Sequence, residues 1–255
     1  MDYKLILSLL LIGHFCGDFY FQSDSMAKKK DDKWWLMIAH GFIYLIAILP
    51  PVLLILYVPV KGWIILAAVP AMHMVVDLIK ALFNRTPAFQ KHTAFWFITD
   101  QIIHISIITA VAWLCASYGG VAYSQLGAYL RQLYEGLQLG LPFAKMIRLV
   151  GLIMFLGKPV NVIIRKMCGA GTDGQSDHEE DQKTGRIIGG LERYLTALFI
   201  VLHQYAAVGF AFTAKSVTRL NKISNDPEFA ETYLIGTFSS LIFAIASVVL
   251  FLNIP

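Results

Sequence analysis

The sequence predicts an all-α protein, a polytopic bundle of transmembrane helices. Of its 255 residues, 57% are hydrophobic and only 15% are charged, whereas a soluble domain carries about 25% charged residues. Runs of about 20 apolar residues, the length that crosses a bilayer as a helix, recur along the whole chain. Because lipid offers no hydrogen-bond partners, such runs are expected to be helical. We expect about seven segments, with six to eight as the range.

The expected segments are separated by polar linkers and turns. They run over residues 4–22, 34–58, 63–83, 95–116, 146–164, 187–213 and 233–252. Pro50-Pro51 is expected to kink the second segment, and Lys158-Pro159 interrupts the fifth.

These segments divide the chain into three parts. Residues 1–117 form a four-helix domain that carries histidine and aspartate, and residues 118–145 form a connector with an amphipathic helix over 126–137. Residues 146–255 contain the C-terminal membrane helices, with a polar loop at 169–185.

The basic residues predict the orientation. Four lysines (28, 29, 30 and 33) lie in the first linker, and Arg85 and Lys91 lie in the third. Because cytoplasmic loops are enriched in such residues, both linkers are expected in the cytoplasm and the N-terminus outside. No basic stripe interleaved with aromatic residues points to nucleic acid, and three isolated cysteines predict neither a disulfide framework nor a thiolate zinc site.

Histidine and aspartate recur in the first four segments. Three i, i+4 pairs place both side chains on one helix face, and the second segment adds one histidine. The set is His14 and Asp18, His73 and Asp77, Asp100 and His104, and His40.

Counting from the cytoplasmic end of each segment puts all seven groups in one leaflet, at a depth of about 6–15 Å. Carboxylates are costly in a bilayer, so partners are expected.

Histidine and aspartate are ligands of Zn²⁺, Mn²⁺ or Fe²⁺. The pattern therefore favours a divalent metal site, with Zn²⁺ or Mn²⁺ preferred. Seven groups are more than one tetrahedral ion can bind. We therefore expect either two ions, or one ion with some of the carboxylates hydrogen-bonded to its histidine ligands. A metal-free proton or ion pathway and a purely structural polar core are the alternatives.

Lys80 follows Asp77 by three residues. It is expected to bind an anionic substrate group, to pair with Asp77, or to extend to the membrane surface. In a hydrolytic mechanism, Lys80 and the aspartates Asp18, Asp77 and Asp100 are the candidate catalytic residues, with one aspartate that does not bind metal acting as general base.

A second polar cluster is expected around the last two segments. It contains Glu192-Arg193, His203-Gln204, Lys215, Arg219 and Glu231, together with Gly189, Gly190, Gly209 and Gly236. Ion pairs between helices and interfacial anchors are the favoured interpretation, and a site for a substrate headgroup is the alternative.

Three motifs of the N-terminal half resemble a bacterial inner-membrane family of unknown function. They are H-x3-D-F-x2-Q at 14–22, H-x3-D-x2-K at 73–80 and D-Q-x2-H at 100–104. The C-terminal half resembles longer members of that family in Gly185 to Arg193, Ala214 to Arg219 and Glu231 to Thr237. Where longer members would have Gly-Gln, this chain has His203-Gln204. The resemblance implies a bacterial inner-membrane location, and the helices are distantly similar to membrane-bound metal-dependent hydrolases.

The leading functional hypothesis is a metal-dependent hydrolase at the cytoplasmic face of the membrane. Its shallow site suits a lipid or phosphoester substrate, so the lipid bilayer and an anionic lipid or phosphoester are the expected partners. An ion or metal transporter and a non-catalytic membrane scaffold are the alternatives.

Overall fold

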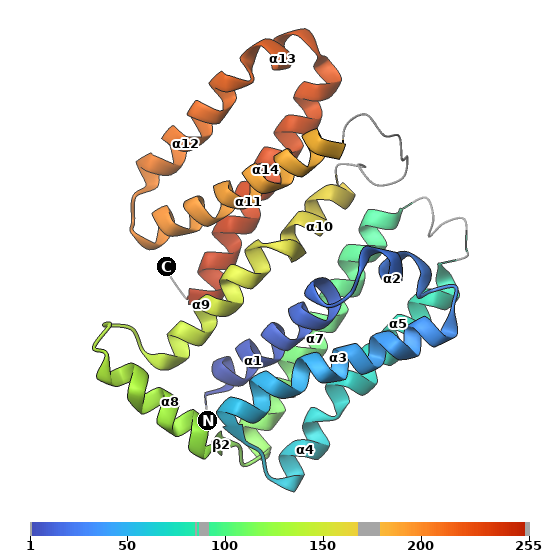
Figure 1. Ribbon diagram of the computed structural model, residues 1–255, viewed down its shortest axis with the longest axis vertical. Coiled ribbons are helices and arrows are strands. Elements are labelled where there is room, and N and C mark those ends of the chain that lie inside the picture. Colours follow the sequence, from blue (N-terminus) through green and yellow to red (C-terminus); the bar gives the residue numbers. More distant parts are fainter. Residues whose placement is uncertain (1, 85, 87–91, 168–178, 253–255) are drawn as a thin grey trace. The chain divides into compact units, whose positions relative to one another are not determined.

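The protein is almost entirely helical, as the sequence predicts, and divides into two compact units, Met1–Gly151 and Leu152–Pro255 (Figure 1). The computed structural model describes residues 2–84, 86, 92–167 and 179–252.

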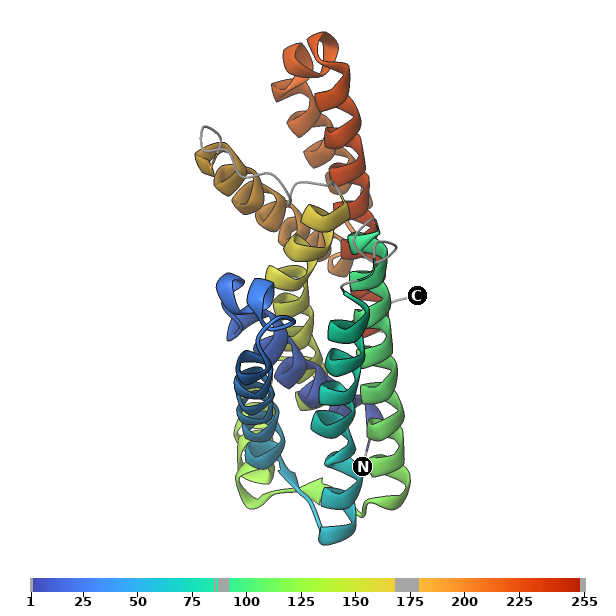
Figure 2. The same cartoon turned by 90° about the vertical axis from the view of Figure 1, so that its right-hand side faces the viewer.

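Unit 1 is built from helices that fold back on one another, with one pair of very short strands (Figures 1 and 2). Its elements are α1 (Tyr3–Phe15), the π-helix η1 (Cys16–Tyr20), α2 (Asp24–Lys29), α3 (Trp34–Ile55), β1 (Leu56–Tyr57), α4 (Val60–Leu66), α5 (Ala68–Phe83), α7 (Thr93–Tyr118), β2 (Ala122–Tyr123) and α8 (Gln125–Gly136). Helix α9 (Phe143–Leu156) leads into unit 2.

Helix α1 lies at the centre of unit 1 and packs against α3 and α7. Nine of its thirteen residues are buried. Gly13 and Gly17 let it approach α3 closely, because a Cβ atom at Gly13 would lie 2.7 Å from the Cα of Ile48 and one at Gly17 would lie 2.8 Å from the Tyr44 ring. Small residues four apart are a common device for close packing of membrane helices. This packing brings the end of α1 into register with α3.

The two strands join the end of α3 to the start of α8. Leu56 pairs with Tyr123 and Tyr57 with Ala122 in an antiparallel ladder. The Ser124 hydroxyl donates to the carbonyl of Leu54 and caps α8 by accepting from the Gly127 amide. Helix α8 confirms the helix expected over 126–137.

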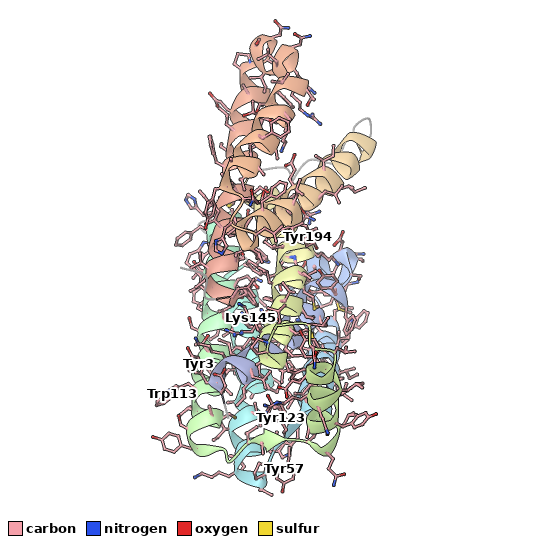
Figure 3. The ribbon with its side chains drawn as sticks, turned by 90° about the vertical axis from the view of Figure 1, so that its left-hand side faces the viewer. Tyr3, Tyr57, Trp113, Tyr123, Lys145 and Tyr194 are labelled. Carbon is pink, nitrogen blue, oxygen red and sulfur yellow. The ribbon has the colours of Figure 1, made fainter. Side chains whose placement is uncertain are left out.

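Five helical stretches of the described chain are long and apolar enough to cross a membrane. They are Trp34–Ile55, Val60–Phe83, Thr93–Tyr118, Phe143–Met167 and Pro227–Leu252. Large apolar side chains such as Tyr57 (61% exposed) and Trp113 (53% exposed) cover the outside of unit 1 (Figure 3), which suits a lipid-facing surface. The protein is therefore a multi-pass membrane protein, but the expected number of seven segments is not confirmed.

Unit 2 continues from the end of α9. Its further helices are α10 (Lys158–Met167), α11 (Glu179–Val201), α12 (Tyr205–Thr218), α13 (Leu220–Asn225) and α14 (Pro227–Leu252). The interruption expected at Lys158-Pro159 is present, since α9 ends at Leu156. Of the polar loop expected at 169–185, the residues from Glu179 onward are helical, and 169–178 lie outside the described residues.

The prediction of a single segment over 187–213 is wrong, because the chain turns between α11 and α12. His203 has a positive φ of 57°, its amide donates to the carbonyl of Ile200, and the Gln204 amide donates to the carbonyl of Phe199. This pattern is a Schellman motif, which ends a helix through one left-handed residue. The apolar composition continues across the turn, so hydropathy alone does not reveal it.

Candidate metal centre

The structure brings all seven expected histidine and aspartate side chains into one cluster inside unit 1. They come from four places in the fold: His14 and Asp18 from α1 and η1, His40 from α3, His73 and Asp77 from α5, and Asp100 and His104 from α7. Each of the four histidines is at most 2% exposed. The i, i+4 spacing therefore turns each pair inward, and the packing of the helices makes the pairs meet.

Asp18 reaches the cluster from a π-helix rather than from a regular α-helix. The amide of Phe21 donates to the carbonyl of Cys16, five residues earlier. A π-turn of this kind inserts one residue into a helix and is frequent at functional sites. It places Asp18 opposite the imidazoles of α3 and α5.

Two imidazole nitrogens and two carboxylate oxygens converge at the centre of the cluster. The Nε2 atoms of His40 and His73 lie 3.1 Å apart. Asp18 Oδ1 lies 3.4 Å from each of these nitrogens. Asp77 Oδ2 lies 3.4 Å from His40 Nε2 and 3.7 Å from His73 Nε2.

These separations fit a shared metal ion. Ligand atoms bound to one tetrahedral Zn²⁺ at about 2.0–2.1 Å lie about 3.3 Å from one another. The Asp18 Oδ1 atom is buried without a hydrogen-bond partner among the described residues, although it is surrounded by two ring nitrogens. Asp18, His40, His73 and Asp77 thus offer the donor atoms and spacing that Zn²⁺ or Mn²⁺ requires, and we call them the central set.

Asp77, Asp100 and His104 form a second group that could hold an ion, with ligand atoms within 4.8 Å of one another. His104 Nδ1 donates to the backbone carbonyl of Asp100 at 2.8 Å. A carbonyl only accepts, so in the neutral ring the lone pair belongs to Nε2, which is buried without a partner among the described residues. Metal-binding histidines are commonly oriented in this way.

Tyr44, which sequence reasoning did not identify, contacts both His73 and His14. It stacks on the His73 ring, with 3.6 Å between centroids and 5° between planes. Its hydroxyl lies 3.2 Å from His14 Nδ1. The only available signal was its position four residues after His40. The Nδ1 atoms of His40 and His73 have no hydrogen-bond partner among the described residues, so the His73 ring is fixed by stacking on Tyr44 and by the contact of its Nε2 atom with His40 Nε2.

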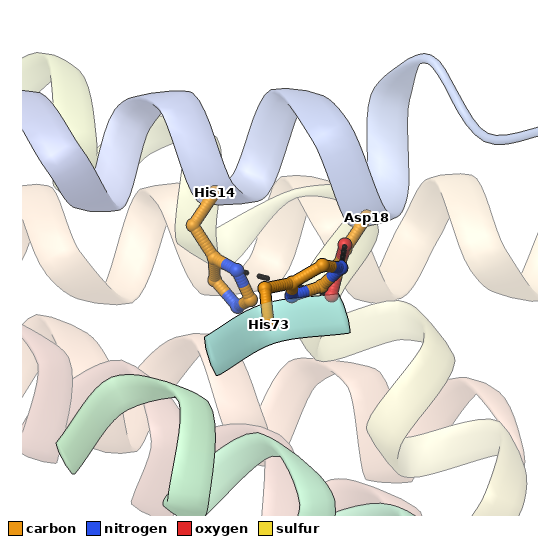
Figure 4. Close-up of side chains that lie close together, drawn as sticks. All are labelled: His14, Asp18 and His73. Carbon is orange, nitrogen blue, oxygen red and sulfur yellow. Dashed lines mark ion pairs between the residues drawn. The ribbon is translucent and has the colours of Figure 1, made fainter. Parts of the chain in front are cut away.

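His14 lies beside the central set. Together with Asp18 and His73 it forms a third group that could hold an ion, and its Nδ1 atom lies 3.8 Å from Asp18 Oδ2. Figure 4 shows His14 and Asp18 projecting from successive turns toward the ring of His73.

Two lysines neutralise part of the carboxylate charge. Lys30 Nζ donates to Asp77 Oδ2 at 2.6 Å, and both side chains are buried. Lys80 Nζ lies 3.1 Å from Asp100 Oδ2. Pairing of Lys80 with Asp77 is therefore wrong, because Lys30 occupies that carboxylate. Lys30 was missed because it sits in a basic linker that also predicts a cytoplasmic loop.

The cluster carries a net negative charge. Three carboxylates face two ammonium groups, which leaves one negative charge when the imidazoles are neutral. Outside it, Asp31 accepts from the Asn84 side chain at 2.8 Å. Burial raises the pKa of the Asp31 carboxyl, against the opposing effect of Lys80 and Lys30. A net negative, water-poor cluster is suited to a cation.

The expected C-terminal cluster is divided in unit 2. Gly189, Glu192, Arg193, Lys215, Arg219 and Gly236 line one cavity. His203, Gly209 and Glu231 are not part of its lining, and His203 serves the turn between α11 and α12.

Comparison with known proteins finds a family that is similar to the N-terminal part of the chain. No curated protein and no solved structure matches the chain. Residues 6–126, which contain all seven histidine and aspartate residues of the cluster, match a family described as "Protein of unknown function (DUF3307)". This match over 6–126 fits the resemblance to an uncharacterised membrane family.

Proposed function

We propose that unit 1 binds a divalent metal ion, Zn²⁺ or Mn²⁺, and hydrolyses a phosphoester or lipid at the membrane surface. The supporting observation is the central set, in which two buried imidazoles, the buried carboxylate of Asp77 and the carboxylate of Asp18 (9% exposed) hold their ligand atoms 3.1–3.7 Å apart in five pairs. When bound, such an ion supplies an acidified water that is nucleophilic near neutral pH.

Asp100 is the proposed general base. Its Oδ2 atom accepts from Lys80 and from the Gln101 side chain, each at 3.1 Å. Its Oδ1 atom is buried without a hydrogen-bond partner among the described residues and is therefore available to accept a proton from water. Lys80 is the proposed contact for the anionic substrate group, because its side chain is more exposed (20%) than that of Lys30 (7%).

The proposed location is the bacterial inner membrane, with the N-terminus outside and the cluster near the cytoplasmic face. The basic first linker supports this orientation, and Lys30 of that linker reaches the cluster.

The two lysine pairs support a second candidate, a membrane scaffold with a metal-free polar core. Lys30 and Lys80 already neutralise Asp77 and Asp100, as a purely structural core would require. A transporter has less support, because the polar groups form one compact cluster rather than a path.

Elemental analysis of the detergent-purified protein separates these candidates. We expect a stoichiometric divalent metal in the wild type and at least an about tenfold lower metal content in His40→Ala, His73→Ala and Asp18→Asn. His92→Ala and Asp32→Asn, which change exposed residues of the same unit, are the matched controls and should retain the metal. A folded wild type that stays metal-free after incubation with Zn²⁺ or Mn²⁺ would support the scaffold.

Hydrolysis is tested separately with a chromogenic phosphodiester and with radiolabelled phospholipid in mixed micelles. Asp100→Asn is expected to keep the metal and to lose turnover, since only the proton acceptor is removed. Lys80→Gln is expected to raise KM more than it lowers kcat. Metal binding without turnover of any anionic ester would support the metal site and contradict the proposed hydrolase activity.

A further inference from the structure

Unit 2 contains a cavity of about 330 Å³ whose charged lining is mainly basic. Cavities of this size accept small molecules or headgroups. Residues of α10, α11, α12 and α14 line it, so four separate stretches of the sequence meet there. Its charged residues are Arg165, Glu192, Arg193, Lys215 and Arg219.

Arg193 is the buried cation of this cavity, with 2% of its surface exposed. Its Nε atom donates to the carbonyl of Leu156 at 2.8 Å, and its Nη2 atom donates to the Asn161 side chain at 2.5 Å. The Ser240 hydroxyl lies 3.5 Å from Nη1. All three acceptors are neutral, although a guanidinium has five N–H groups and a permanent charge. The charge of Arg193 is therefore oriented but not neutralised by these contacts.

Two glycines of α11 lie next to this guanidinium. A Cβ atom at Gly189 would lie 3.5 Å from Nη1, and one at Gly190 would lie 3.9 Å from Nη2. These residues precede Arg193 by four and three positions on α11, so the side chain extends back over its own helix. Gly189 also lines the cavity, where a larger side chain would take up the space next to the guanidinium.

The single carboxylate of the lining already has its own partner. Glu192 accepts from Lys215 Nζ at 2.6 Å, and the same ammonium lies 5.2 Å from the centroid of the Tyr233 ring. Among the side chains that the structure describes, Arg165 and Arg219 form no ion pair. The cavity therefore carries three guanidinium groups without a carboxylate partner among those described residues.

The rest of the lining is largely apolar, and includes Ile164, Ile188 and Phe229. A purely polar anion would leave these side chains without contacts. An anion joined to an apolar body would satisfy both parts of the lining. Planar guanidinium groups are matched to phosphate oxygens, which they bind through paired hydrogen bonds.

We propose that this cavity binds a phosphate group, with Arg193, Arg165 and Arg219 as its ligands. The phosphate belongs to an anionic lipid headgroup or to a soluble phosphate ester. This inference concerns unit 2 alone and does not depend on a metal ion in unit 1.

The test uses full-length protein in nanodiscs of phosphatidylcholine with or without phosphatidylglycerol. Native mass spectrometry then counts the lipids retained after release. We expect the wild type to retain phosphatidylglycerol, and Arg165→Gln and Arg219→Gln each to reduce retention about tenfold, since each removes a charged donor. Neither side chain holds a described structural contact, so both variants should fold. Lys166→Gln, which removes an exposed cation next to Arg165 on α10, is the matched control and should behave as the wild type.

A second measurement identifies the source of the phosphate. Inorganic phosphate is titrated into protein in pure phosphatidylcholine nanodiscs, and the melting temperature is followed. Stabilisation by phosphate that Arg165→Gln and Arg219→Gln abolish, without retained phosphatidylglycerol, would support the soluble ester. If both variants match Lys166→Gln with both probes, the cavity is not a phosphate site and the proposal is overturned.

Discussion

The cluster in unit 1 and the cavity in unit 2 solve the cost of buried charge in opposite ways. In unit 1, three carboxylates meet two ammonium groups and four imidazoles, and the donor atoms of the central set lie close enough to share an ion. In unit 2, Arg193 is held by neutral acceptors beside an open space that other guanidinium groups also line. The first arrangement is negative and is suited to a cation. The second is mainly basic and is suited to an anion.

This difference predicts how each region responds to the loss of one charge. A buried charge whose partner is removed costs several kcal/mol, because it stays desolvated. A guanidinium held by neutral groups leaves behind only unsatisfied acceptors, which cost less. Two substitutions test this contrast, and two more test the helix packing of unit 1 and the turn of unit 2, in order of decreasing expected effect.

Asp77→Ala should have the largest effect, because it leaves Lys30 buried and unpaired. We expect a loss of about 3–5 kcal/mol of stability, measured as a lower melting temperature in detergent by tryptophan fluorescence. The double variant Lys30→Met with Asp77→Leu should recover most of this loss. The control is a substitution that breaks the exposed ion pair between Arg131 and Glu135, and it should leave the melting temperature unchanged. A small effect of Asp77→Ala would mean that the pair is not desolvated.

Arg193→Leu should have the next largest effect. It leaves the Leu156 carbonyl and the Asn161 side chain without their donor, at a cost of about 3 kcal/mol that is seen as a lower melting temperature. Arg193→Lys should rescue little of this, since an ammonium cannot contact several acceptors in a fork. Full rescue by lysine would show that charge alone matters at this position.

Gly13→Ala should lower stability by about 1–3 kcal/mol, because its Cβ would meet the α3 backbone at Ile48 and force the two helices apart. The same shift would move Asp18 away from His40, so metal affinity should fall in parallel. Gly209→Ala is the matched control, since nothing lies within 4 Å of its Cβ position, and it should stabilise α12 slightly. Equal melting temperatures for the two variants would contradict close packing of α1.

His203→Gly should have the smallest effect and the opposite sign. A left-handed conformation costs a residue with a Cβ about 1 kcal/mol more than glycine, so the melting temperature should rise by a small amount. His203→Ala keeps the Cβ and should not stabilise. The sequence resemblance points to the same position, because a Gly-Gln pair is expected where this chain has His203-Gln204.

Much of the fold can be predicted from the composition and the spacing of apolar residues, and the predictions that failed have specific causes. Long apolar runs locate α3, α7 and α14, because length and hydropathy are sufficient in a membrane. They fail at the turn between α11 and α12, where a single left-handed residue ends a helix inside a continuous apolar sequence. Tyr44 was also missed, because a tyrosine in an apolar helix carries no signal of what it will stack against.

The sequence alone determined that these histidines and aspartates face inward, because an i, i+4 spacing places both members of each pair on one side of a helix. It also predicted a similar depth for them, since helical rise sets their distance from the segment ends. Only the tertiary structure decided which groups meet. The close approach of α1 and α3 at Gly13 and Gly17, the π-turn at Asp18 and the return of Lys30 to Asp77 depend on contacts between distant segments. Such contacts are set by the packing of whole helices, which no local pattern encodes.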